Sequence, residues 1–218
     1  MAAPHDGHIV GGPDAVSDAP GLKRLLAQII ALDHRCYAVE SHGHIGTRDQ
    51  WLPVFARNPD TWRALVDAHG AVVAYWQIAA LSPARYGLAR QGLLHPADLG
   101  AEDYEPLTRP GRYQLYFVSV CIAPEWRNLA TYWRLFDALF EISEKLARAG
   151  VYFEEMAATA HSVDGRQMCV AFGLDFVGLA PDHGECFAGP FRGVLERMRG
   201  ALARRRPELL DLYGVPAS

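Results

Sequence analysis

The chain has 218 residues, of which 50% are hydrophobic and 21% are charged, and its formal net charge is −4. This length can bury one sizeable core, while the slightly negative charge argues against a nucleic-acid partner, because a phosphate backbone demands a strongly basic face. No apolar run is long enough to span a bilayer, the first residues lack a signal-peptide pattern, and the four cysteines follow no disulfide spacing. We therefore expect a single cytoplasmic domain over residues 1–218, with reduced cysteines and no membrane partner.

Helices and a hairpin are expected in the first third of the chain. An apolar stripe at helical spacing predicts a helix that begins at Pro20 and runs to Cys36. The sequence Thr47-Arg48-Asp49-Gln50 is a capping box, which opens a second helix that ends near Asn58. Apolar runs on both sides of His69-Gly70 predict a β-hairpin. The strands expected in this third are a weak one near residues 8–10 and the hairpin pair at 62–66 and 71–81.

The segment 82–112 is rich in glycine and proline, and these residues interrupt every regular pattern within it. We expect this segment to be a long loop. A loop of roughly 30 residues is uncommon in a compact domain and is often functional.

Strands and helices alternate in the second half of the chain. An apolar run with strong β-propensity gives way to a long helical pattern, and shorter strands and helices follow. This order predicts an α/β fold with a mixed, mostly antiparallel central sheet flanked by helices, in which the strands at 113–123 and 151–159 form one parallel pair. The elements expected here are strands at 113–123, 151–159, 174–179 and 185–188, helices at 128–149 and 163–172, and a helical tail at 190–218 that is interrupted at Pro207.

The junction between strand 113–123 and helix 128–149 carries the main functional signal. Arg127 stands between the two elements. The unpaired N–H groups of a helix's first turn and the helix dipole both favour an anion. We therefore predict that a phosphate of a nucleotide-like or coenzyme-like ligand binds at this junction.

Two motifs resemble the GCN5-related N-acetyltransferases. The sequence from Pro124 to Tyr132 is similar to that family's coenzyme A pyrophosphate loop, with Arg127 at its first position and Ala130 and Tyr132 where two small residues are usual. The sequence from Phe172 to Gly178 is similar to the family's helix-Gly-Phe-strand ending. The resemblance covers roughly residues 20–180. It implies the acyl-CoA N-acyltransferase fold, with a splayed parallel strand pair, acetyl-CoA as co-substrate and no metal. The cofactor-binding residues that it implies are Val120, Cys121, Ile122, Arg127, Asn128, Leu129, Ala130, Thr131 and Tyr132.

The resemblance also implies a reaction, in which an acetyl group passes directly from acetyl-CoA to an amine of a small molecule or a peptide. The family's usual proton donor to the leaving thiolate is a Tyr, and the matching position here is Cys169. Cys169 is a candidate acid or a small buried hydrophobe, and Tyr132 and Tyr116 are alternative acids. The candidate bases are His161, after the strand at 151–159, and Glu154 and Glu155 within it. Because these two glutamates point to opposite faces, only one of them can face a cleft.

Other functions remain open alongside this one. The stretch from Leu32 to Glu40 faintly resembles the acyl-homoserine lactone and N-acyl amino acid synthases, which take longer acyl chains from acyl carrier protein. A domain that keeps the fold as a binding module without catalysis is a further alternative. We expect the basic tail to pack on the domain or against a second copy in a homodimer, with a carrier-protein docking surface as the alternative. Histidines and cysteines near residues 34–44 and 183–186 meet no zinc spacing, so we expect no metal.

Overall fold

The computed structural model describes residues 7–37 and 45–216, and the chain forms two compact units. Unit 1 comprises residues 1–78, 95–102 and 118–139, and unit 2 comprises residues 79–94, 103–117 and 140–218. The strand order β1-β2-β3-β4-β5-β7-β6 describes one seven-stranded sheet. This confirms the predicted mixed sheet with flanking helices.

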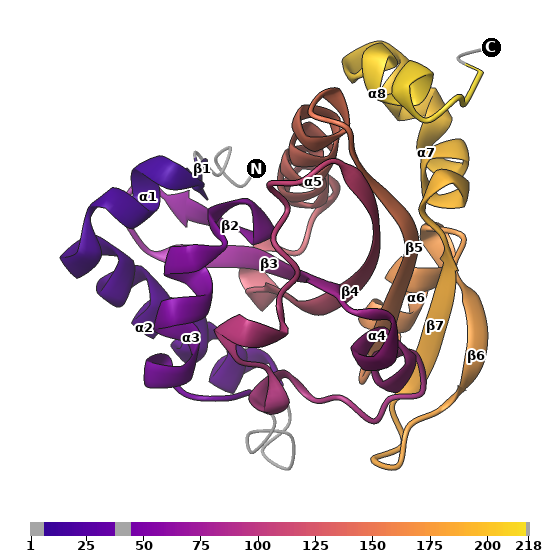
Figure 1. Cartoon of the computed structure of the whole chain (residues 1–218). Helices are drawn as coiled ribbons and strands as arrows, with labels where there is room; N and C mark the ends of the chain where they lie inside the picture. Colours follow the sequence, from indigo (N-terminus) through magenta and orange to yellow (C-terminus); the bar gives the residue numbers. More distant parts are fainter. Residues whose placement is uncertain (1–6, 38–44, 217–218) are drawn as a thin grey trace. The chain divides into compact units, whose positions relative to one another are not determined.

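In unit 1, three antiparallel strands lie beside helices from the first third of the chain (Figure 1). Strand β1 pairs with β2, with His8 opposite Val66, and β2 pairs with β3, with Ala64 opposite Tyr75. The predicted hairpin and the weak first strand are therefore confirmed. The elements are β1 (Gly7–Gly11), α1 (Pro13–Ser17), α2 (Ala19–Cys36), α3 (Arg48–Arg57), β2 (Trp62–Asp67) and β3 (Val72–Leu81), of which β3 enters unit 2 after Ile78.

The capping box at the start of α3 forms as predicted. The Thr47 side chain accepts a hydrogen bond from the Gln50 backbone N–H at 3.3 Å, and the Gln50 side chain accepts one from the Thr47 N–H at 3.2 Å. Gln50 also donates to the backbone oxygen of Leu99 at 2.7 Å. The same side chain thus starts a helix and holds the segment 95–102 against it.

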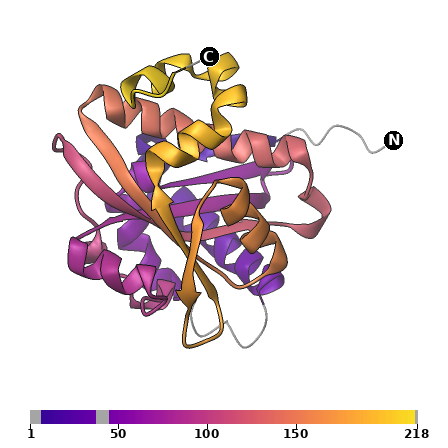
Figure 2. The same ribbon diagram turned by 90° about the vertical axis from the view of Figure 1, so that its right-hand side faces the viewer.

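Unit 2 contains the parallel pair of the sheet. Strand β4 (Gly111–Ile122) pairs with β5 (Val151–Ala160), from Gly111 opposite Val151 to Phe117 opposite Ala158. Strand β4 then continues for five residues to Ile122, in unit 1. Strand β5 also pairs antiparallel with β7, and β7 with β6, as a hairpin that Figure 2 shows clearly. The remaining elements that follow β4 are α5 (Leu129–Arg148), α6 (Val163–Ala171), β6 (Asp175–Leu179), β7 (Glu185–Pro190), α7 (Phe191–Arg205) and α8 (Pro207–Leu212).

The segment 82–112 is not the continuous loop that we expected. It contains helix α4 (Pro83–Arg90) and two single-turn helices, at Pro96–Asp98 and Ala101–Asp103. The Ser82 side chain caps α4 by accepting from the Arg85 N–H, and Pro83 stands at its first position, where its missing N–H costs nothing. The stabilisation from the Ser82 cap and from burial of Tyr86 and Ala89 therefore exceeds the helix-propensity cost of the glycine within α4.

The C-terminal tail is helical, as predicted, with a break at Pro207 between α7 and α8 (Figure 2). Arg148 at the end of α5 donates from Nε to Glu208 at 2.7 Å, and its Nη2 contacts both Glu208 and Glu144. The Tyr213 hydroxyl accepts a hydrogen bond from the Phe153 N–H of β5 at 2.9 Å. The tail is thus bonded to a helix and a strand of unit 2. Within the described residues, no helix is both long and apolar enough to cross a membrane.

Candidate functional site

Arg127 lies at the junction predicted to bind phosphate. A single turn, Pro124–Trp126, separates the end of β4 from Arg127, and α5 begins two residues later. The Arg127 Nε donates to the backbone oxygen of Ile122 at 3.1 Å, while the residue as a whole is exposed. The strand end therefore holds the guanidinium group in place at the surface, where it can meet an anion.

The first turn of α5 is already partly capped by the chain itself. The Asn128 side-chain oxygen accepts from the Thr131 N–H at 3.0 Å, and the Asn128 backbone oxygen accepts from the Tyr132 N–H at 3.1 Å. The Asn128 N–H donates to the Trp126 oxygen at 2.9 Å. Three of the five backbone donors predicted to hold a pyrophosphate thus have partners within the chain. A phosphate would have to displace the Asn128 amide to reach the Thr131 N–H.

The Tyr132 ring packs along its own helix. It stacks on Phe136, one turn further on, with 6.4 Å between ring centroids and 16° between ring planes. Phe136 is buried and Tyr132 is partly buried. This contact favours packing of the ring against the helix's apolar face over an orientation toward a bound pyrophosphate.

The end of β4, which the family resemblance predicts to bind the cofactor, contacts the C-terminal end of α2. The Val120 oxygen accepts from the Tyr37 hydroxyl at 3.0 Å, and the Ile122 oxygen accepts from the Cys36 thiol at 3.7 Å. The Cys121 thiol donates to the Leu32 oxygen at 3.8 Å. Residues 120–122 are therefore hydrogen-bonded to the C-terminal end of α2, through the side chains of Cys36 and Tyr37 and the backbone of Leu32.

A buried carboxyl group lies next to this contact. Asp33 is only 5% exposed, and the Tyr75 hydroxyl of β3 is 2.6 and 2.7 Å from its two oxygens. Burial, opposed in part by the hydrogen bond from Tyr75, raises the pKa of Asp33 to about 7. The Tyr75 hydroxyl is also 2.7 Å from the Ser119 hydroxyl of β4, and Ser119 lies 3.1 Å from the Tyr37 hydroxyl.

Asp33 and Tyr75 are site residues that the sequence alone does not single out. The signal was present, because Leu22, Leu26, Ile29 and Asp33 recur at helical spacing, and all four are buried on α2. An acidic residue on the buried stripe of a helix is rare unless it is paired. Its partners on β3 and β4 are distant in sequence, so only the folded chain reveals them.

Cys36 is the one partly exposed thiol among the four cysteines. A hydrogen bond from Cys121 lowers the pKa of Cys36 to about 7, and Arg127 and Arg35 act in the same direction. The pKa of Cys121 is raised by the same hydrogen bond and by burial. The pair therefore lowers the pKa of the more exposed Cys36 thiol and raises that of the buried Cys121 thiol.

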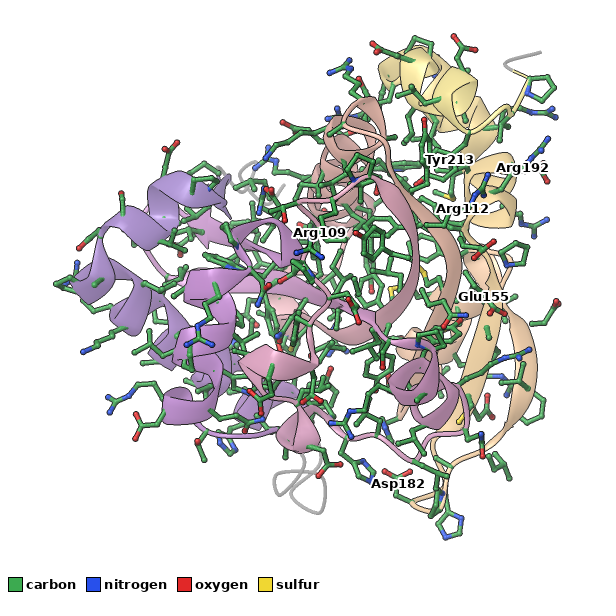
Figure 3. The ribbon with its side chains drawn as sticks, in the orientation of Figure 1. Arg109, Arg112, Glu155, Asp182, Arg192 and Tyr213 are labelled. Atoms are coloured by element: carbon green, nitrogen blue, oxygen red, sulfur yellow. The ribbon has the colours of Figure 1, made fainter. Side chains whose placement is uncertain are left out.

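Glu155 is the more enclosed of the two candidate glutamates in unit 2. It lies opposite Gln114 in the parallel pair, and Figure 3 labels it. It is 3.9 Å from Arg90, and its side chain is 27% exposed. Burial and the nearby Glu155 carboxylate raise the pKa of Tyr86. Glu154 is exposed. Of these two glutamates, Glu155 is thus the one described with a cationic neighbour, Arg90, and a nearby phenol, Tyr86.

The other catalytic candidates have different surroundings. His161 Nδ1 is 3.9 Å from the Asp182 carboxylate in the β6–β7 turn, where Figure 3 labels Asp182.

Cys169 is buried, and burial raises its pKa to about 12. A thiol with that pKa is a poor match for protonating another thiolate, so the structure favours the buried-hydrophobe alternative for Cys169. The alternative acid Tyr116 is buried, and its hydroxyl donates to the Leu94 oxygen at 3.3 Å.

In the part of the chain that the structure describes, no three His, Cys, Asp or Glu side chains are grouped to hold a metal ion. His42 and His44, which the sequence placed near His34 and Cys36, lie outside the described residues.

No protein-family model matches the chain, and no curated protein matches its sequence. Several solved structures are similar to it. The GNAT-like decarboxylase GphF, in complex with isobutyryl-CoA, matches with a TM-score of 0.55 and 16% identity, over 84% of this chain and 99% of that one. A bacterial toxin matches with a TM-score of 0.51 and 16% identity, over 93% and 98%. Naa50 of Arabidopsis thaliana, in complex with the bisubstrate analogue CoA-Ac-MVNAL, matches with a TM-score of 0.50 and 9% identity, over 84% and 97%.

These similarities define the class of fold. The chain has the fold of the GNAT, or GCN5-related N-acetyltransferase, proteins, as its strand order and parallel β4–β5 pair also indicate. The names of the similar proteins include a decarboxylase and a toxin as well as Naa50. The fold alone therefore does not fix the reaction, and the chemistry must be argued from this chain's own residues.

Proposed function

We propose that this protein is an acyltransferase that uses a coenzyme A thioester, with acetyl-CoA as the first donor to test, and an amine as acceptor. The observation that carries the proposal is the junction at the end of β4. There β4 runs five residues beyond its last described pair with β5. It leads to Arg127, an exposed residue whose guanidinium group is hydrogen-bonded to the Ile122 oxygen. An extended strand end followed by a cation and a helix start suits a long ligand with a phosphate at one end.

The similar structures support this class of ligand. One contains isobutyryl-CoA, and another contains an analogue whose name joins CoA, an acetyl group and a peptide. For this chain, we propose that Arg127 contacts the pyrophosphate, that the first turn of α5 adds backbone donors, and that residues 120–122 line the thioester. Because the first similar structure holds a branched acyl group, isobutyryl-CoA is the second donor to test.

Within unit 2, we propose Glu155 as a residue that attracts and orients the amine acceptor, with His161 as the alternative. Glu155 is favoured because its side chain is partly enclosed, with Arg90 3.9 Å away and Tyr86 nearby. We assign no proton-donating role to Cys169, because its pKa is too high for the task.

Calorimetric titration with acetyl-CoA tests the donor site. We expect the wild type to bind, and Arg127→Glu to bind at least about 10-fold more weakly, because a charge-assisted hydrogen bond contributes about 1.5–3 kcal/mol and is replaced by repulsion. Arg57→Glu is the matched control, since it makes the same charge change on an exposed residue of unit 1. Equal binding by Arg127→Glu and the wild type would contradict the assigned site.

A screen of amines with both donors then tests turnover. Release of free coenzyme A that depends on an amine supports acyl transfer. Tight binding with no turnover for any amine would instead support the alternative of a binding module that has kept the fold. Activity only with a donor loaded on acyl carrier protein would support the synthase-like alternative.

A further inference from the structure

Four oxygen-to-oxygen contacts join Asp33 to the end of β4. The first links Asp33 to the Tyr75 hydroxyl at 2.6 Å, and the second links Tyr75 to the Ser119 hydroxyl at 2.7 Å. The third links Ser119 to the Tyr37 hydroxyl at 3.1 Å, and the fourth links Tyr37 to the Val120 backbone oxygen at 3.0 Å. Each distance is within hydrogen-bonding range, so each contact requires one proton.

The three hydroxyl groups supply only three protons for these four contacts. Burial raises the pKa of both Tyr37 and Tyr75, so each phenol keeps its proton and contributes one. The Val120 oxygen is an acceptor only. If Asp33 is ionised, one contact in the series therefore has two oxygen atoms facing each other without a proton. If Asp33 is protonated, all four contacts are complete, from the carboxyl group through both phenols to Val120.

We propose that Asp33, Tyr75, Ser119 and Tyr37 form a proton relay that takes up the proton lost by the acceptor amine and stores it on Asp33. This inference rests on the proposed function, since it assigns the proton's path in that same reaction. The relay ends at Val120, one of the residues proposed to line the thioester. Asp33 is a positioning residue in this scheme, because it acts through Tyr37 and does not touch the substrate.

The proton movement balances. The amine nitrogen loses a proton as its N–H bond breaks, and the Tyr37 oxygen gains that proton. The Tyr37 proton passes to Ser119, the Ser119 proton to Tyr75, and the Tyr75 proton to the Asp33 carboxylate. The carboxylate becomes a neutral carboxyl group, every hydroxyl keeps one proton, and Tyr37 completes its hydrogen bond to Val120.

The surroundings of Asp33 suit this role. The titratable groups that face it are Tyr75 from β3, Cys121 from β4, and Cys36 and Tyr37 from the end of its own helix. Because Asp33 is buried among them, its pKa of about 7 lies close to neutral pH, where a group can both accept and release a proton.

The variant Asp33→Asn distinguishes a network that relays protons from one that only stabilises the fold. A side-chain amide at this position can donate to Tyr75 as a protonated carboxyl does, so all four contacts survive. It cannot take up a further proton. We expect the variant to fold and to bind acetyl-CoA as the wild type does, but to lose turnover by about 100-fold, the usual scale of proton-transfer catalysis.

The pH profile and an infrared measurement complete the test. In the wild type, we expect turnover to rise through about pH 7 as Asp33 ionises, and the C=O band of a protonated carboxyl group to disappear over the same range. Both changes should be absent in Asp33→Asn and present in the control Asp14→Asn, which alters an exposed carboxylate on α1. Tyr75→Phe should keep a titrating carboxyl group and lose turnover, because the first and second contacts are both broken.

Two outcomes would overturn the relay while leaving the proposed function intact. One is wild-type turnover and an unchanged pH profile in Asp33→Asn, and the other is no carboxyl titration near pH 7 in the wild type. If the wild type neither binds an acyl-CoA nor acylates any amine, the proposed function itself is wrong, and the relay's catalytic use is wrong with it.

Discussion

The hydroxyl group of Tyr75 lies almost equally far from both carboxylate oxygens of Asp33, at 2.7 and 2.6 Å, although 42 residues separate the two in sequence. Helix α2 supplies the acid and strand β3 supplies the phenol. Asp33 has no cationic partner in the contacts described for it, and a buried carboxyl group in that setting favours its neutral form. This relationship has consequences for stability as well as for chemistry.

Asp33 should make the stability of the protein depend on pH. Its pKa is raised from 3.8 to about 7 on folding, so the folded state holds a proton that the unfolded state releases between about pH 4 and pH 7. Raising the pH through this window therefore favours unfolding. From pH 5 to pH 8, the unfolding free energy of the wild type should fall by about 2–3 kcal/mol relative to that of Asp33→Asn, which has no carboxyl group to titrate at this position.

Urea denaturation of both proteins at the two pH values measures this difference. Asp14→Asn, which changes an exposed carboxylate, should follow the wild type at both. A difference between wild type and Asp33→Asn that is the same at pH 5 and pH 8 would show that the carboxyl group does not titrate in this range.

Cys36 should be the most reactive of the four cysteines. Its lowered pKa raises its thiolate fraction above that of an ordinary cysteine, and it is partly exposed while Cys121, Cys169 and Cys186 are buried. We expect iodoacetamide to label Cys36 first, as peptide mass mapping over time would show.

The matched variant for this prediction is Arg127→Gln, which removes one of the positive charges that lower the pKa of Cys36. Labelling of Cys36 should become slower in this variant at pH 7.5. Labelling of all four cysteines at one rate would contradict the difference in exposure and in charge.

The capping box should contribute measurably to the stability of α3. Thr47→Ala removes the acceptor for the Gln50 N–H, and loss of such a cap typically costs about 1 kcal/mol. Chemical denaturation would detect the loss. Thr108→Ala, at an exposed turn position, serves as the control, and equal stability of both variants would show that the cap adds nothing.

Tyr132 should matter more for stability than for ligand access. Because its ring stacks on Phe136, we expect Tyr132→Ala to lose about 1 kcal/mol of unfolding free energy and to bind acetyl-CoA within about 2-fold of the wild type. Calorimetry and denaturation give the two values. Binding that becomes much tighter in the variant would mean that the ring obstructs the ligand.

Local signals in the sequence predicted most of the fold. The Thr47–Gln50 capping box, the hairpin at 62–81 and the break at Pro207 each depend on neighbouring residues, and each forms as expected. Helix α4 was missed because its stability comes from the Ser82 cap and from burying Tyr86, which outweigh the unfavourable local glycine and proline content. Helix α1 (Pro13–Ser17) was missed as well, because five residues carry too little periodicity to detect.

The candidate site was harder to predict than the fold. Arg127 was identified because its place between a strand and a helix is visible in the sequence. Asp33 was not, because its importance depends on Tyr75 and Ser119, which only folding brings to it. Glu154 and Glu155 differ only in the face of β5 on which they lie, and the position of Arg90 distinguishes them.

The hydrogen bond between Phe153 and Tyr213 also sets an order for folding during synthesis. Strand β5 lies inside the sheet, between β4 and β7, yet the acceptor for this N–H comes from a tyrosine 60 residues further along the chain. While the ribosome is still making α6 and the β6–β7 hairpin, the Phe153 N–H has no Tyr213 to bind. Unit 2 can therefore complete its native contacts only after residue 213 has emerged, and until then water must satisfy the Phe153 N–H.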